Sequence, residues 1–111
     1  MPWFKVDDTL AFHSKIVAAG NSAVGLWTRA GAWSMQTLTD GFVPFHIARQ
    51  LGSKTDARRL CEVGLWDEKD DGYVFHEWDQ RQPSRAKVMA DREATANRVK
   101  NWRKKKGETD V

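Results

Sequence analysis

Few residues of this chain have the type and spacing that catalysis or metal binding requires. The histidines His13, His46 and His76 lie far apart on different predicted elements, and none has a second ligand at the spacing of a metal site. Cys61 has apolar helical neighbours, which predicts a thiol packed in the core. The acidic run 67–71 lacks the length and ligand pattern of a calcium loop, and we interpret it as a solvated hairpin tip. The sequence therefore predicts a protein that is not an enzyme and that needs no metal or cofactor.

The distribution of charge is more informative than the total of +3. Residues 1–80 contain eight Lys and Arg against eleven Asp and Glu, a net charge of −3. Residues 81–106 contain ten basic and two acidic residues, a net charge of +8. An acidic body with a basic extension indicates a polyanionic partner, which is either nucleic acid or an acidic protein surface. The alternative is a solvated helix that only keeps the protein soluble.

The basic extension is expected to form a long helix from residue 84 to about residue 106. If it lies along DNA, neutralising several phosphates makes the affinity fall steeply with salt. Two alternatives stay open: small and apolar residues between positions 86 and 94 form a shallow seam for a homodimer, or the extension is partly disordered without a partner. The candidate DNA-binding residues here are Arg85, Lys87, Arg92, Arg98, Lys100, Arg103, Lys104 and Lys105.

A second basic surface is expected on a helix over residues 55–63, whose apolar face is formed by Ala57, Leu60 and Cys61. A helix of this size fits the major groove, where an arginine can donate two hydrogen bonds to guanine. A lysine and the helix N-terminal amides suit phosphates. The alternative is that these arginines are ordinary surface charges. The candidate DNA-binding residues here are Ser53, Lys54, Thr55, Arg58 and Arg59.

Two helices are expected to precede this surface. Phe12, Ile16 and Ala19 recur on one face of a first helix that follows N-cap candidates at residues 7–9 and ends at Gly20. A second helix then begins at Asn21-Ser22. Its expected core-facing residues are Val24, Trp27, Gly31 and Met35.

The remaining elements follow one another closely after a turn at residues 39–41. They are a strand at 42–43, a helix at 44–51 that begins with Pro44 and ends at Gly52, the helix at 55–63, a β-hairpin made of 65–66 and 73–76, and a connector at 77–83. This order predicts an α+β fold, namely a winged helix-turn-helix with a small β-hairpin wing and a long basic C-terminal helix. We expect a winged-helix domain at residues 1–80 and a basic helical extension at residues 81–111.

Several short motifs carry a resemblance to a known family. They are Trp-Phe-Lys-Val-Asp-Asp at 3–8, Gly-Leu-Trp at 25–27, Asp-Gly-Phe-Val-Pro at 40–44, Gly-Leu-Trp at 64–66, and Asp-Gly-Tyr-Val-Phe-His-Glu-Trp at 71–78 followed by Gln82. Over residues 3–83 the chain resembles the N-terminal winged-helix domain of phage replisome organisers, and more broadly the DnaD-like primosomal proteins and small helix-turn-helix proteins of actinobacterial phages. The resemblance implies binding to origin or operator DNA and a phage or prophage source.

The hairpin tip departs from that family, because its acidic residues outnumber Lys69 four to one over residues 67–71. Phosphates repel such a tip, so we expect it to lie off the DNA backbone or to face a protein.

These features predict a phage-type winged-helix protein that binds double-stranded DNA in transcriptional control or replication initiation. The alternative is a winged-helix interaction protein that binds and modulates a host replication or transcription protein. No segment is apolar enough for a membrane span, the N-terminus lacks a secretory pattern, and the single cysteine excludes an internal disulfide. We therefore expect a location in the host cytoplasm, associated with the nucleoid.

Overall fold

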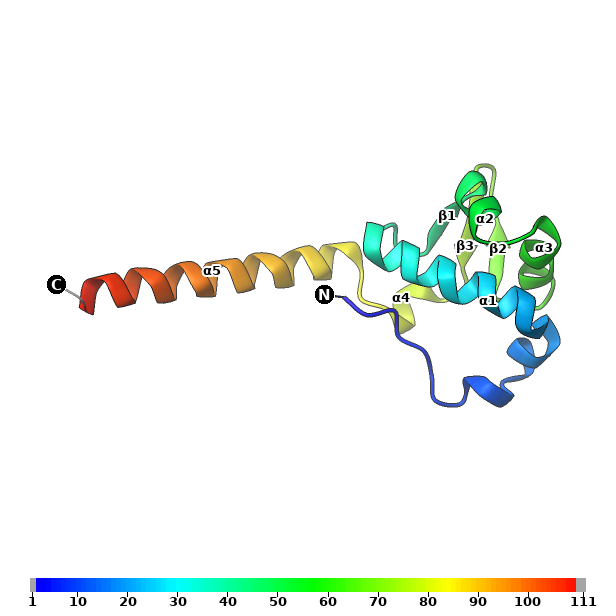
Figure 1. Cartoon of the computed structure of the whole chain (residues 1–111), viewed down its shortest axis with the longest axis horizontal. Helices are drawn as coiled ribbons and strands as arrows, with labels where there is room; N and C mark the ends of the chain where they lie inside the picture. Colours follow the sequence, from blue (N-terminus) through cyan, green and yellow to red (C-terminus); the bar gives the residue numbers. More distant parts are fainter. Residues whose placement is uncertain (1, 110–111) are drawn as a thin grey trace.

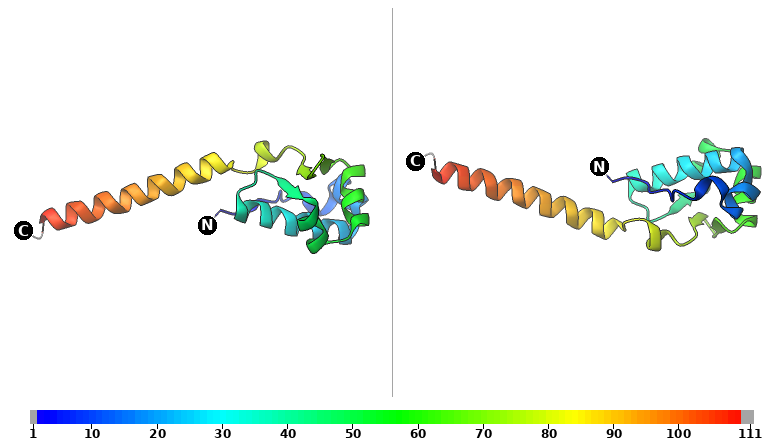
Figure 2. Two further views of the ribbon diagram at one scale, coloured as in Figure 1. Left: turned by 90° about the horizontal axis from the view of Figure 1, so that it is seen from above. Right: turned by 90° about the horizontal axis from the view of Figure 1, so that it is seen from below.

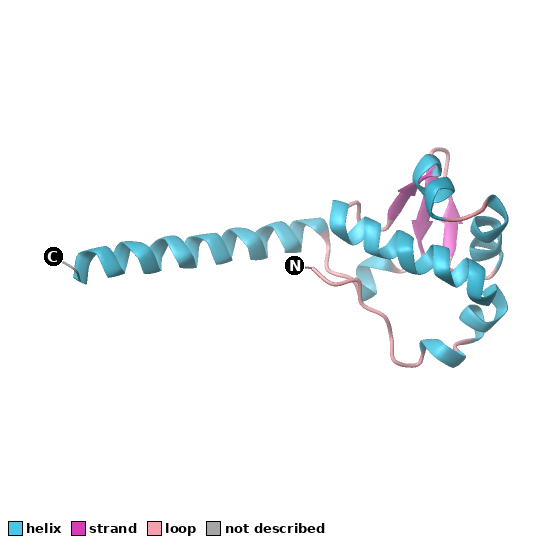
Figure 3. Cartoon of the chain, in the orientation of Figure 1, coloured by secondary structure: helices cyan, strands magenta, loops and turns pink. Residues whose placement is uncertain are grey.

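The computed structural model describes residues 2–109, with side chains through residue 105. Residues 110–111 of the expected extension lie outside the described residues. Helices pack around a small antiparallel sheet, which confirms the α+β class (Figure 3). The helical elements are η1 (Leu10–Phe12), α1 (Ser14–Thr37), α2 (Phe45–Leu51), α3 (Lys54–Glu62), α4 (Trp78–Arg81) and α5 (Arg85–Thr109). The strands are β1 (Phe42–Pro44), β2 (Trp66–Glu68) and β3 (Gly72–Phe75), in the spatial order β1-β3-β2.

Helix α1 contains both helices expected before residue 39. The backbone at Gly20 is non-helical, with φ of 82°, so the break falls where the sequence predicts the first helix to end. The start of that helix differs from the prediction. His13, rather than a residue at 7–9, caps α1 by accepting a hydrogen bond at Nδ1 from the Lys15 amide. The extended backbone of His13 separates α1 from η1, so Phe12 lies 93% exposed and its expected inward position is wrong.

The buried face of α1 is displaced from the predicted one. Gly31 and Met35 are buried as expected, whereas Val24 and Trp27 are only half-buried. The residues that face the core in their place are mostly small: Ala19, Ala23, Leu26 and Ala30. Small side chains allow α1 and α3 to pack closely, because the two backbones can approach each other. Close packing against α3, rather than the spacing of the large apolar residues, therefore decides which face of α1 is buried.

The centre of the core lies where α1 and α3 cover the sheet. Leu26, Val43, Leu60 and Trp66 are each at most 1% exposed, and they come from four different elements. Trp66 pairs with Phe75 across β2 and β3. Fully burying an aliphatic or aromatic side chain of this kind stabilises a fold by about 1.5–3 kcal/mol. This core holds the two-stranded hairpin and α3 to α1 as one unit.

The N-terminal segment is extended and forms no strand within the described residues. Phe4 inserts between Trp27, Phe75 and Trp78, with ring centroids 5.2–5.9 Å from each. Gly31 makes this insertion possible, because a Cβ there would collide with the Phe4 ring. The segment thereby completes an aromatic cluster with residues of α1, β3 and α4.

The expected connector at residues 77–83 is more ordered than the sequence suggests, because it contains α4 and buries Trp78 and Gln82. The Gln82 amide forms two hydrogen bonds with the backbone of Lys5, accepting from its N–H at 2.9 Å and donating to its carbonyl at 2.7 Å. Segments at the two ends of the body are therefore joined at the base of α5.

The whole molecule measures 65 × 30 × 20 Å, because α5 projects from one end of the packed part (Figure 1). Below, residues 2–83 are called the body and α5 is called the arm.

Candidate nucleic-acid interface

Helix α3 begins at a capping box. Ser53 Oγ accepts a hydrogen bond from the Asp56 amide, and the Asp56 carboxylate accepts one from the Ser53 amide. Asp56 also accepts a hydrogen bond from Ser22 of α1 at 3.0 Å. Burial alone would raise the pKa of Asp56, but these hydrogen bonds lower it below its ordinary value. Ser53, a predicted DNA-binding residue, therefore uses its hydroxyl in the cap.

The exposed face of α3 carries the predicted basic residues. Lys54, Thr55, Arg58 and Arg59 are all exposed, while Ala57 and Leu60 are buried on the opposite face. Among the described residues, no carboxylate lies within ion-pair distance of Arg58 or Arg59. The predicted helix bounds, 55–63, differ by one residue from the observed Lys54–Glu62. This face can therefore offer its arginines to an anion without first breaking an ion pair.

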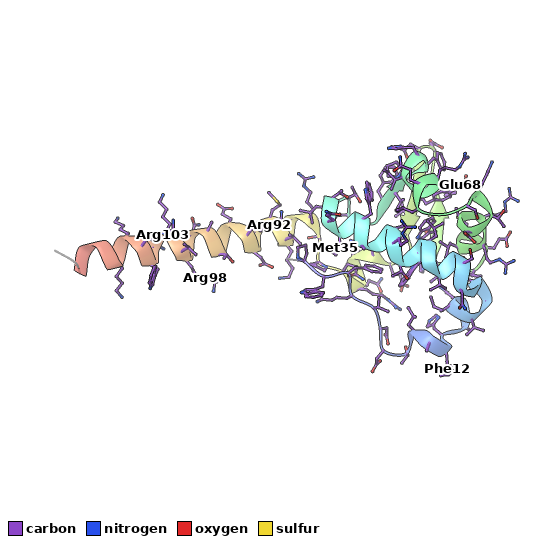
Figure 4. The ribbon with its side chains drawn as sticks, in the orientation of Figure 1. Phe12, Met35, Glu68, Arg92, Arg98 and Arg103 are labelled. Atoms are coloured by element: carbon purple, nitrogen blue, oxygen red, sulfur yellow. The ribbon has the colours of Figure 1, made fainter. Side chains whose placement is uncertain are left out.

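The tip of the β2–β3 hairpin is acidic and exposed. Asp67, Glu68, Asp70 and Asp71 all lie at the surface, and Figure 4 shows Glu68 at this edge of the body. The carboxylates act on nearby groups: burial raises the pKa of Cys61, and Glu68 and Asp67 raise it further. Since β2 packs against α3, the hairpin brings negative charge close to the C-terminal end of that helix.

The arm starts from two helix-start hydrogen bonds. Asp40, in the turn before β1, accepts a hydrogen bond from the Arg85 amide at 2.6 Å, and Ser84 Oγ accepts one from the Lys87 amide at 3.1 Å. Val88, 7% exposed, packs into the core. From Met89 to Lys105 every side chain is exposed. The body therefore fixes the first turn of the arm, and the rest extends away from it.

The predicted basic residues of the arm surround the helix. Arg85, Arg92 and Arg103 are separated by seven and eleven residues, which places them on one face of an α-helix. Lys87, Arg98 and Lys105 have the same separations and lie on the opposite face. Lys100 and Lys104 lie between these faces. Figure 4 shows Arg92, Arg98 and Arg103 along the arm, clear of the body.

Two acidic residues accompany the eight basic ones between positions 85 and 105. Asp91 forms an i,i+4 ion pair with Lys87 at 3.3 Å, and both side chains are mostly exposed. Such a pair stabilises a helix by only about 0.3–0.5 kcal/mol. The basic residues therefore outnumber the acidic ones by six, and the arm keeps a strong net positive charge.

The two basic surfaces lie at opposite ends of the molecule. Helix α3 forms the end remote from the arm, and α1 runs across the body between them (Figures 1 and 2). The structure thus groups the thirteen predicted residues into two separate sites and does not bring the two sets together.

Comparison with known protein families, curated protein sequences and solved structures found no match to this chain. No helix among the described residues is long and apolar enough to cross a membrane. The same part of the chain holds no group of three or more His, Cys, Asp or Glu residues placed to bind a metal ion.

Proposed function

We propose that this chain is a winged-helix protein that binds double-stranded DNA, with the arm on phosphates and α3 in the major groove. The observation that carries the proposal is the arm itself. It projects into solvent with eight basic and two acidic residues between positions 85 and 105. A helix with like charges around it pays for their mutual repulsion, and a polyanion removes that repulsion.

The winged-helix assignment rests on the order of elements after α1. Strand β1 leads into α2, α2 and α3 are joined only by Gly52 and Ser53, and the β2–β3 hairpin follows α3. In such folds the second helix of the pair enters the major groove. The exposed Arg58 and Arg59 then face base edges, and Lys54 at the start of the helix faces phosphate.

The positions of the two surfaces suggest that they contact different stretches of DNA. The arm leaves the body at the end opposite α3, so it points away from the duplex that α3 would enter. The acidic hairpin tip would lie off the phosphates, because repulsion there opposes close contact. The resemblance of residues 3–83 to replisome organisers extends the proposal to replication initiation or transcriptional control by a phage protein in the host cytoplasm.

The direct test is titration of a fluorescently labelled duplex with the full chain, followed by anisotropy, at about 50 mM and about 200 mM salt. We expect binding at the lower salt and a loss of affinity of roughly a thousandfold at the higher salt. Absence of binding at low salt would overturn the proposal.

A second candidate function is favoured by the acidic hairpin tip. Its exposed carboxylates fit a basic protein surface better than DNA, and the chain would then modulate a host replication or transcription protein. A pull-down from host lysate with and without nuclease separates the two functions. Capture that survives nuclease supports the protein partner, and capture that nuclease abolishes supports DNA.

A further inference from the structure

A cavity of about 440 Å³ lies between the N-terminal segment and the body. Residues of the segment from Phe4 to Leu10 form one side, and residues from α1, β3 and α4 form the other. Its size falls in the range of small-molecule sites in proteins, about 300–1,000 Å³. Neither α3 nor the arm contributes a residue to its lining, so this cavity is separate from both basic surfaces.

The aromatic cluster supplies an apolar wall. Phe4, Trp27, Phe75 and Trp78 all line the cavity, and Phe4 lies nearly parallel to Trp78 with ring centroids 5.9 Å apart. Phe75 meets Trp78 edge-on at 5.1 Å. A wall of rings in both orientations suits a planar apolar ligand, which can stack on some faces and contact the edges of others.

A basic side chain of the lining that lacks a close partner is Lys15. Lys15 is half-buried as a residue, and its ammonium donates a long hydrogen bond of 3.5 Å to the Gly64 carbonyl. Among the described residues no carboxylate lies within ion-pair distance of it. A charged acceptor that reaches this ammonium would form a stronger hydrogen bond than the long one to Gly64.

The acidic groups of the lining are already engaged. Asp7 accepts hydrogen bonds from the amide and hydroxyl of Thr9, which lower its pKa. Glu77 lies 3.4 Å from Nε2 of His76. The cavity lining contains three basic residues, Lys5, Lys15 and Arg81, against these two acidic ones, so it favours a negative ligand over a positive one.

We propose that this cavity binds a small planar organic anion, of which an aromatic carboxylate is the simplest type. The carboxylate is held by Lys15, and the ring lies against the wall formed by Phe4, Trp27 and Trp78. The proposal does not depend on DNA binding. It does place a ligand against Lys15, which donates a hydrogen bond to Gly64, two residues after the end of α3, and beside Gln82, three residues before the arm.

The test compares two probes of matched shape on the full chain: 1-naphthylacetate, which is an anion, and 2-(1-naphthyl)ethanol, which is neutral. Calorimetry gives the affinities, and the indole N–H signals in the amide NMR spectrum report the location. We expect the anion to bind and to shift the signals of Trp27 and Trp78 but not that of Trp102 in the arm. We also expect it to bind about 10-fold more tightly than the alcohol, the effect of one hydrogen bond to a charged group.

Variants at Lys15 decide whether that side chain selects the anion. Lys15→Met should weaken the anion about 10-fold and leave the alcohol unchanged, whereas Lys15→Arg should retain most of the preference. Lys69→Met removes an exposed lysine outside the cavity and outside both basic surfaces, and it serves as the matched control. The proposal is overturned if neither probe shifts Trp27 or Trp78, if both probes bind equally, or if Lys15→Met binds the anion as tightly as the wild type.

Discussion

The body and the arm use their side chains in different ways. In the body, residues from four elements are at most 1% exposed and each contacts several others. In the arm, no side chain from Met89 to Lys105 is buried, and apolar residues such as Val99 and Trp102 lie 44% and 61% exposed. The net charge also changes sign between the two. Packing therefore explains the residues of the body, whereas we propose that a polyanionic partner explains the basic composition of the arm.

The largest difference between the body and the arm is expected when one apolar residue in each is truncated. Leu60→Ala in α3 should lower the free energy of unfolding by about 3 kcal/mol, because it removes contacts and leaves a cavity. Val99→Ala in the arm should change it by less than about 0.5 kcal/mol. Urea unfolding followed by tryptophan fluorescence gives both values. A loss at Val99 as large as that at Leu60 would mean that the arm packs on something in the free protein.

Neutralising part of the arm should have the next largest effect. The arm variant Arg92→Gln, Arg98→Gln, Lys100→Gln, Arg103→Gln should bind duplex DNA roughly 100-fold more weakly near 100 mM salt. Its stability should not change, since none of the four side chains packs on the body. Anisotropy titration measures the affinity, and circular dichroism confirms the helix. Undiminished affinity would show that the arm does not contact DNA.

Replacing the exposed arginines of α3 should have a smaller effect on DNA affinity, and its size should depend on the DNA sequence. The preferred duplex is first selected from a random pool with the wild type. The double variant Arg58→Ala, Arg59→Ala should bind this duplex about 10-fold more weakly. Binding to an arbitrary duplex should change less. Arg49→Ala, an exposed arginine of α2, is the control. An equal loss on every duplex would mean that α3 contacts phosphates only.

The smallest effect is expected at the α3 cap. Asp56→Ala should cost about 1 kcal/mol at neutral pH by removing the capping box. The pKa of Asp56 is lower in the folded state than in the unfolded state. Its contribution to stability is therefore complete at a pH above the ordinary carboxyl pKa, and it is lost as the pH falls through the folded-state pKa. Urea unfolding at pH 7 and at about pH 3 should therefore show the wild type and the variant converging in acid. A constant difference would contradict the role of the charged form.

Much of the body could be predicted from the sequence at positions where a single residue type determines the backbone conformation. Gly20 marked the break in α1, the turn at 39–41 preceded a short strand, and Gly52 ended α2. Packing between distant segments could not be predicted in this way. The small-residue face of α1, the exposure of Phe12 and the burial of Trp78 all depend on which element covers which.

The candidate interface was easier to predict than the cavity. A local run of basic residues indicates a charged helix by composition alone, and the α3 face follows from helical spacing. The sequence could not reveal that these surfaces lie at opposite ends of the body. The cavity joins Lys15, Trp27 and Trp78 across more than sixty positions, so no local pattern signals it.

The central claim, that the arm neutralises DNA phosphates, is tested most directly by the salt dependence of duplex binding for the wild type and the arm variant. A plot of the logarithm of affinity against the logarithm of salt concentration should be linear, with a slope for the wild type of about −6 or steeper. The slope of the arm variant should be shallower by about four, one for each phosphate contact removed. Equal slopes for the two proteins, or a shallow slope for the wild type, would contradict the claim.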